Sequence, residues 1–189
     1  MNSLQHWTNT QLLACLFGLR GGHHYRACEE TLEPLFSATE GRWQRKGAAL
    51  REVFRRWLEE CLQRGEVLGQ PDQVKNYLRL IFKGQAHESF WVLYLNAQHQ
   101  LIVAEELFRG TLTQTAIYPR EVLKAALRHN AAALLLAHNH PSGKVQPSHA
   151  DRQLTEVLKR ALELVDIQVL DHFVVAGPDL ASFAEMGWI

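Results

Sequence analysis

Residues 131–151 read AAALLLAHNHPSGKVQPSHAD, and this stretch decides the fold because a buried apolar run leads directly into a cluster of polar side chains. Ala131 to Ala137 has the length and composition of a buried strand. If that strand continues into the polar cluster, His138 and His140 share one face of it, because side chains two residues apart on a strand point the same way. One cation could therefore bind both imidazoles.

Asp151 is the natural third ligand for such a cation. The turn at Pro141-Ser142-Gly143 and the loop through Pro147 bring the chain back toward the two histidines. Zinc in catalytic sites takes three protein ligands and leaves a fourth position for water. The spacing therefore predicts an open metal site formed by His138, His140 and Asp151.

The same residues allow a purely structural interpretation. Ser148 to Asp151 has the spacing of a capping box, S-x-x-D, just before a sequence that is typical of a helix. Capping and metal ligation are compatible, since the positive potential at a helix N-terminus favours an ionised carboxylate. For His138 and His140 the alternative is an ordinary pair of loop histidines with satisfied hydrogen bonds.

Two longer segments resemble the RadC family, whose C-terminal domain belongs to the JAMM (MPN-type) metalloprotease-like superfamily. They are TLTQTAIYPREVLKAALRHNAAA and LLLAHNHPSGKVQPSHADRQLTEVLKRALELVDIQVLDHFVVAG. The resemblance extends from about His87 to the C-terminus. The pattern H-x-H-x7-S-x2-D, from His138 to Asp151, matches the zinc signature of the superfamily without gaps.

The resemblance implies a fold, a cofactor and site residues. The fold is a three-layer α/β JAMM/MPN domain, similar to the deaminase-like fold, with a mixed sheet. The ligands of one Zn²⁺ per chain are His138, His140 and Asp151, and Ser148 is a hydrogen-bond donor to the transition state. The family name reflects an assignment to DNA repair, and the resemblance leaves the substrate open.

The resemblance also indicates a general base. Glu88 precedes the first predicted strand of HESFWVLYL, where the superfamily has its catalytic glutamate, and we favour it over Glu105 and Glu106, which could instead protect an edge strand. The predicted reaction is hydrolysis of a peptide or isopeptide amide, with a protein or peptide as substrate. We expect His172 to be packed beside the site rather than to act as a fourth ligand.

The chain divides near Gly65 to Asp72, where glycine, proline and aspartate cluster. Residues 1–68 are predicted to form a helical module, with helices over Gln11 to Leu19 and Ala48 to Leu62, and residues 69–189 the hydrolase domain. In fuller RadC relatives the first segment contains a helix-hairpin-helix that contacts DNA. Residues 39–47 lack a convincing G-x-G hairpin, so the module is degenerate in this respect.

A short basic run remains in this module. Arg42, Arg45 and Lys46, followed by three further arginines, could contact nucleic acid from a loop and a helix, although a solvated helix face is the preferred interpretation. We expect Trp43 and Trp57 to belong to a core. Weak, salt-dependent nucleic-acid binding is the most that this run predicts.

Helical and strand periodicity predict the elements of the second domain. Helices are expected at Pro71 to Phe82, Pro119 to His129 and Asp151 to Leu164, and strands at Phe90 to Leu95, Leu101 to Phe108, around Thr111 to Ala116, Ala131 onward and Gln168 to Ala176. A short segment of unspecified structure follows Gly177-Pro178-Asp179.

Composition bounds the remaining possibilities. The chain has 20 basic and 20 acidic residues, which is not the excess expected of a strong nonspecific nucleic-acid binder. No leader-like or membrane-spanning apolar segment is evident, so we expect a cytoplasmic protein without membrane association. Two other function classes stay open: a metal-dependent nuclease or DNA-repair-associated DNA-binding protein, and a non-catalytic partner-binding module with a structural metal.

Overall fold

The computed structural model describes residues 8, 11, 15, 41–110 and 117–189. The chain divides into two compact units, with the boundary between Phe54 and Arg55. The strand predicted around residues 111–116 lies outside the described residues, as does most of the helix predicted over residues 11–19. The second unit contains the sheet that positions the site.

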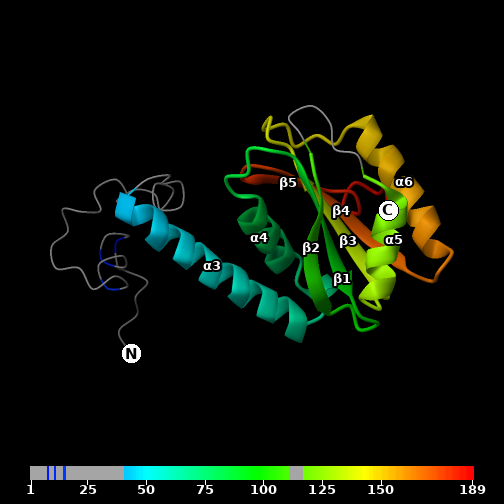
Figure 1. Ribbon diagram of the computed structural model, residues 1–189, viewed down its shortest axis with the longest axis horizontal. Helices are drawn as coiled ribbons and strands as arrows, with labels where there is room; N and C mark the ends of the chain where they lie inside the picture. Colours follow the sequence, from blue (N-terminus) through cyan, green and yellow to red (C-terminus); the bar gives the residue numbers. More distant parts are fainter. Residues whose placement is uncertain (1–7, 9–10, 12–14, 16–40, 111–116) are drawn as a thin grey trace. The chain divides into compact units, whose positions relative to one another are not determined.

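Five strands form one mixed sheet in the order β2-β1-β3-β4-β5 (Figure 1). Their bounds are Ser89–Leu95 for β1, Leu101–Arg109 for β2, Ala133–Asn139 for β3, Gln168–Ala176 for β4 and Asp179–Ser182 for β5. β3 and β4 are parallel, whereas β1 runs antiparallel to β2 and β3, and β5 runs antiparallel to β4. The predicted mixed α/β sheet is confirmed.

Helices cover both faces of this sheet (Figure 1). α4 (Pro71–Phe82) packs on one face, and α5 (Pro119–Arg128) and α6 (His149–Glu163) pack on the other. Strand periodicity assigns the side chains: Phe90, Val92 and Tyr94 of β1 face α5 and α6, while Leu93 and Leu95 face α4. This arrangement is the three-layer domain expected from the sequence, and α4 has the predicted bounds.

β3 carries the predicted apolar run into the histidine cluster. Leu134 and Leu136 pack toward α5 and α6, so His138, the next side chain in that series, lies on the same side of the sheet. His140 is the first residue beyond the strand, and its N–H donates to the carbonyl of Val175 at 2.8 Å. The chain is therefore still held against β4 where it leaves the sheet.

The helix α3 (Gly41–Arg64) begins earlier than predicted. Arg42, Arg45 and Lys46 are helical, which corrects the expectation that part of the basic run lies in a loop. The predicted helix began only at Ala48, after Gly47, but one glycine within a helix costs only about 1 kcal/mol, and the surrounding residues are good helix formers. A 3₁₀ helix, η3 (Val67–Gly69), follows.

The apolar side chains of α3 do not all become core. Leu58 and Leu62 are buried, whereas Trp57 is 55% exposed, so the expectation that this tryptophan belongs to a core is wrong. Trp43 has no described side chain. Within the ranges that the structure describes, no helix combines the length and apolarity needed to cross a membrane.

β5 is a strand that the sequence analysis left unassigned. Register pairs Ala176 with Asp179, so Gly177 and Pro178 form a two-residue hairpin loop. Gly177 has φ 61°, the conformation that glycine adopts readily at the first central position of such a turn. At four residues, β5 was too short for an alternating pattern to indicate it.

Candidate metal site

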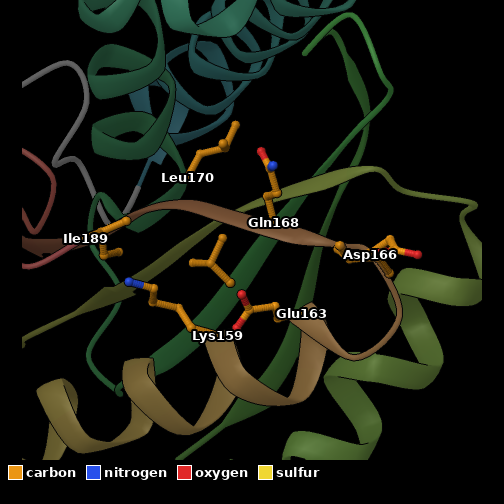
Figure 2. Close-up of a pocket in the computed structure, with 8 residues that line it drawn as sticks. Lys159, Glu163, Asp166, Gln168, Leu170 and Ile189 are labelled. Carbon is orange, nitrogen blue, oxygen red and sulfur yellow. The ribbon is translucent and has the colours of Figure 1, made fainter.

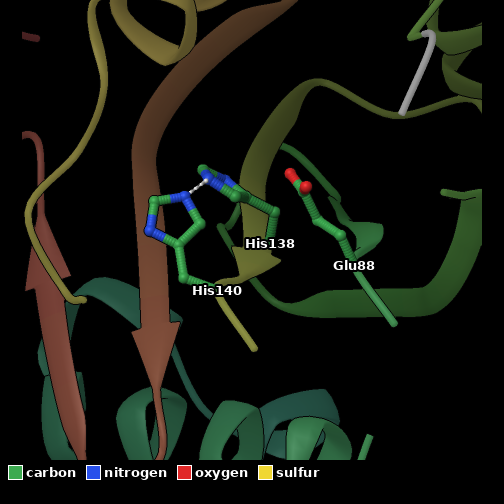
Figure 3. A group of neighbouring side chains, drawn as sticks. All are labelled: Glu88, His138 and His140. Atoms are coloured by element: carbon green, nitrogen blue, oxygen red, sulfur yellow. Dashed lines mark hydrogen bonds between the residues drawn. The ribbon is translucent and has the colours of Figure 1, made fainter. Parts of the chain in front are cut away.

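The sheet register places Glu88 beside the two histidines. Phe90 pairs with His138 across β1 and β3, and continuing the same antiparallel register by two residues puts Glu88 opposite His140. Side chains two apart share a face, so Glu88 emerges on the same side as His138. Figure 3 shows the Glu88 carboxylate directed toward the His138 ring.

Within the described residues, Glu88, His138 and His140 form a group that could hold a metal ion, with ligand atoms all within 4.8 Å of one another. Asp151, at the start of α6, approaches the same two rings. Its Oδ1 lies 3.4 Å from Nε2 of His138, and its Oδ2 lies 3.7 Å from Nε2 of His140. The three residues that the sequence predicted as ligands are therefore brought together.

The distances suit a small tetrahedral cation. The Nε2 atoms of His138 and His140 are 3.1 Å apart (Figure 3). Ligands at about 2.0 Å from a tetrahedral zinc ion are about 3.3 Å from one another. The separations of 3.1 Å between the two nitrogens and 3.4 Å to Asp151 Oδ1 are close to that value.

Hydrogen bonding leaves His140 with a ligand nitrogen facing the site. Its Nδ1 donates to the carbonyl of Lys144 at 2.7 Å, because a carbonyl can only accept. In the neutral ring, Nε2 then carries a lone pair. This lone pair points toward Nε2 of His138, 3.1 Å away, so a cation beside the two nitrogens would have a lone pair of His140 to bind. The donor set therefore fits a metal ion.

Asp151 is held as an ionised group. Burial raises its pKa, but hydrogen bonds and charge interactions with His138 and hydrogen bonds from the Ser148 hydroxyl and backbone N–H outweigh burial, so the pKa lies well below the usual range. Both donors of Ser148 bind Oδ2, at 2.6 Å each. Oδ1 accepts no hydrogen bond from Ser148 and faces His138, so this oxygen could bind a cation as a monodentate ligand.

Ser148 is the N-cap of α6 and forms the capping box anticipated from its spacing. The Asp151 N–H donates to the Ser148 hydroxyl at 3.1 Å, and that hydroxyl donates to the Asp151 carboxylate. Because its proton is directed to Asp151, the hydroxyl must rotate before it can donate to a substrate. Its role as a transition-state donor stays a prediction.

We expect Ser148→Ala to destabilise the fold by about 1 kcal/mol near neutral pH, because the substitution removes the helix cap. The ionised Asp151 stabilises the folded state above its unfolded pKa of about 3.9, and this contribution is lost as pH falls through the lower folded pKa. Without the hydrogen bond from the Ser148 hydroxyl the pKa of Asp151 rises, so the difference in stability between neutral and acidic pH becomes smaller. Urea unfolding at about pH 7 and about pH 3 measures both effects. Equal stability of Ser148→Ala and wild type at neutral pH would contradict the capping role.

Asn139, between the two histidines, fixes the backbone around Glu88. Its Oδ1 accepts from the Ser89 N–H at 2.8 Å, and its Nδ2 donates to the His87 carbonyl at 2.9 Å. The Glu88 carbonyl accepts from the Gly110 N–H at 2.8 Å. The sequence analysis missed this residue; the only available signal was a buried amide at the end of an apolar strand.

The other two candidate bases have different partners. Glu105 contacts Arg128 at 2.7 Å and His129 at 3.0 Å. Glu106 binds Arg109 through two hydrogen bonds of 2.8 and 2.9 Å. Both lie on β2, the edge strand of the sheet, and neither belongs to the group formed with the histidines. Glu88 is the glutamate that the fold brings to His138.

His172 of β4 lies behind His138, where it is inaccessible to solvent. Its Nε2 is 2.8 Å from Nδ1 of His138, on the side of that ring away from His140. Its Nδ1 is 2.6 Å from the hydroxyl of Thr155, a residue that the sequence analysis did not single out. Thr155 follows Asp151 by four residues on α6, and this helical spacing was the signal that could have identified it.

A separate cavity of about 500 Å³ lies between the C-terminal half of α6 and the start of β4 (Figure 2). Its lining includes Lys159, Glu163, Asp166, Gln168 and the terminal Ile189. None of its lining residues belongs to the histidine group. The cavity is therefore separate from the candidate metal site at the end of β3.

Comparison with known proteins agrees with the geometry. Residues 68–188 match a family model described as a RadC-like JAB domain. A UPF0758 protein of Chromobacterium violaceum is 56% identical over 159 residues, covering 82% of this chain and 71% of that protein. A UPF0758 protein of Herminiimonas arsenicoxydans is 58% identical over 139 residues, covering 74% and 62%. A third, of Vibrio parahaemolyticus, is 50% identical over 169 residues, covering 84% and 75%. The chain thus spans 62% to 75% of the length of these relatives.

Proposed function

This chain belongs to the family of proteins with a RadC-like JAB domain, and from that premise we propose that it is a metal-dependent hydrolase that cleaves a peptide or isopeptide amide. The observation that carries the proposal is the convergence of two imidazole nitrogens and two carboxylates at the end of β3. One carboxylate is held by a helix cap and the other lies at the entry to β1. Two carboxylates in different surroundings can take different roles.

We assign the cation to His138, His140 and Asp151, because the Ser148 donors leave Oδ1 of this carboxylate toward the imidazoles. Two nitrogens and one carboxylate oxygen are a donor set typical of catalytic zinc sites, so one Zn²⁺ per chain is the proposed cofactor. When bound, the cation supplies polarisation of the substrate carbonyl and acidifies water.

Glu88 then acts as the general acid and base. Its carboxylate takes a proton from the attacking water and returns it to the nitrogen of the leaving amine, so the proton is conserved in the reaction. The Asn139 hydrogen bonds on either side of Glu88 hold the backbone that aims this carboxylate. Ser148, after rotation of its hydroxyl, would hydrogen-bond the oxygen that develops negative charge.

Two rival functions predict different behaviour. A nuclease would use the same cation on phosphodiesters, and the basic run of α3 with Arg42, Arg45 and Lys46 is the segment that we would expect to contact nucleic acid. A non-catalytic module would close the site with a fourth protein ligand, and Glu88 is the side chain placed to supply it. The open three-ligand arrangement with a separate base favours hydrolysis.

The experiment is a substrate panel with the zinc-loaded 189-residue chain. We expect slow but zinc-dependent cleavage of one class of peptide or isopeptide substrate, removed by a chelator and restored by Zn²⁺, with DNA left intact. Zinc-dependent cleavage of DNA with no peptide cleavage would favour the nuclease. Tight zinc binding without turnover on either panel would favour the non-catalytic module.

A further inference from the structure

A chain of buried hydrogen bonds runs from His138 into the space between β4 and α6. His172 connects His138 Nδ1, at 2.8 Å, to the Thr155 hydroxyl, at 2.6 Å. The rings of Phe90 and Phe183 lie 5.7 and 4.7 Å from the His172 ring and enclose it in apolar surroundings. A polar chain in such surroundings requires every donor to have an acceptor.

The direction of each hydrogen bond follows from the last acceptor. Thr155 Oγ1 lies 2.7 Å from the backbone carbonyl of Asp151, which cannot donate, so the hydroxyl gives its single proton there. The contact between Thr155 and His172 must then use the N–H on Nδ1 of His172.

The remaining bond reaches the metal site. His172 is inaccessible to solvent between the Phe90 and Phe183 rings, and its two ring nitrogens face Thr155 and His138. Burial without a carboxylate at either nitrogen favours the neutral ring with only one N–H. Because the N–H of His172 is on its Nδ1, the Nε2 of His172 is an acceptor. The Nδ1 of His138 therefore donates to the Nε2 of His172. With one proton fixed on Nδ1, His138 can offer the lone pair of Nε2 to a cation on the side of His140 and Asp151 once Nε2 carries no proton.

We infer that His172 and Thr155 are positioning residues that hold His138 in the tautomer required for binding a cation. This inference rests on the proposed metal site. The chain of bonds begins at one ligand, His138, and ends at the backbone of another, Asp151, so it also couples the ends of β3 and α6. A neutral imidazole acceptor fixes the tautomer without adding a charge to a buried position.

Thr155→Val tests this inference, with Thr155→Ser as the matched control. Valine keeps the shape of threonine but leaves His172 Nδ1 without its acceptor, so His172 can move its proton to Nε2 and force the His138 proton to the nitrogen that faces the cation. We expect zinc affinity, measured by chelator competition on the full chain, to fall about 10- to 100-fold in Thr155→Val. Thr155→Ser keeps the hydroxyl and should stay within about threefold of wild type.

Nitrogen-15 NMR of the imidazoles gives a second readout, which loss of packing alone would not change. Without added metal, at about pH 8.5 where an ordinary imidazole is neutral, His138 should carry its proton on Nδ1 in wild type and Thr155→Ser, and should show a mixture of tautomers in Thr155→Val. Unchanged tautomers together with unchanged zinc affinity in Thr155→Val would overturn the inference. If wild-type protein binds no zinc, the proposed function fails and the nitrogen shifts alone decide the role of His172 and Thr155.

Discussion

Glu88→Gln is expected to lower the turnover of any amide substrate by about 10²- to 10⁴-fold, the range typical of a lost general acid or base. Glutamine keeps the size of the side chain but cannot accept the proton of the attacking water. The Asn139 hydrogen bonds to the flanking backbone are untouched by the change, so the fold should be preserved. Steady-state kinetics and zinc content are measured on the same preparation.

Glu106→Gln is the matched control. Glu106 lies on β2, where it pairs with Trp91 of β1, and its carboxylate binds Arg109 instead of facing the histidines. We expect its turnover to stay within about threefold of wild type, because Glu106 does not belong to the group formed with the histidines. Loss of zinc from Glu88→Gln would instead identify Glu88 as a ligand. If the Gln variants of Glu88, Glu105 and Glu106 all stay active, the proposal of a glutamate base is wrong.

Removal of a ligand should have the second large effect. We expect His138→Ala and His140→Ala each to weaken zinc binding by more than the 10- to 100-fold typical of residues that only support a ligand. Affinity in wild type should also fall as pH decreases, because protons compete with the cation for its imidazole and carboxylate ligands. Chelator competition across pH measures both effects.

His99→Asn provides the control for the histidine variants. His99 lies in the turn before β2 with φ 55°, a conformation that asparagine tolerates, and its ring is 3.8 Å from Glu66. Its zinc affinity should equal that of wild type. Stoichiometric zinc in the double variant of His138 and His140 would show that the metal binds elsewhere.

The strand that leads into the site was predictable because it is a continuous apolar run of the length of a buried strand. Ala131 to Ala137 indicated a buried strand, and period two placed His138 on one face before any coordinates were considered. The capping box at Ser148 was equally local, since it depends on residues within one turn of α6. Such features follow from short segments and need no knowledge of the tertiary fold.

Other parts of the site depend on register between distant segments, which short-range patterns do not specify. Asn139 reaches the backbone at Ser89, 50 residues away, and His172 reaches His138 across 34 residues. The register of β1 against β3 also decides that Glu88, and not Glu105, meets the histidines. The predicted helix began at Ala48, whereas α3 begins at Gly41, because the tendency of glycine to break a helix is weak enough for its neighbours to override.

Anomalous X-ray scattering at the zinc edge, from crystals of the zinc-loaded 189-residue chain, tests the central claim most directly. The account predicts one zinc ion per chain, at about 2.0–2.2 Å from His138 Nε2, His140 Nε2 and one oxygen of Asp151, with Glu88 outside the coordination sphere. A zinc ion bound at other residues, or one closed by Glu88 as a fourth protein ligand, would contradict the account.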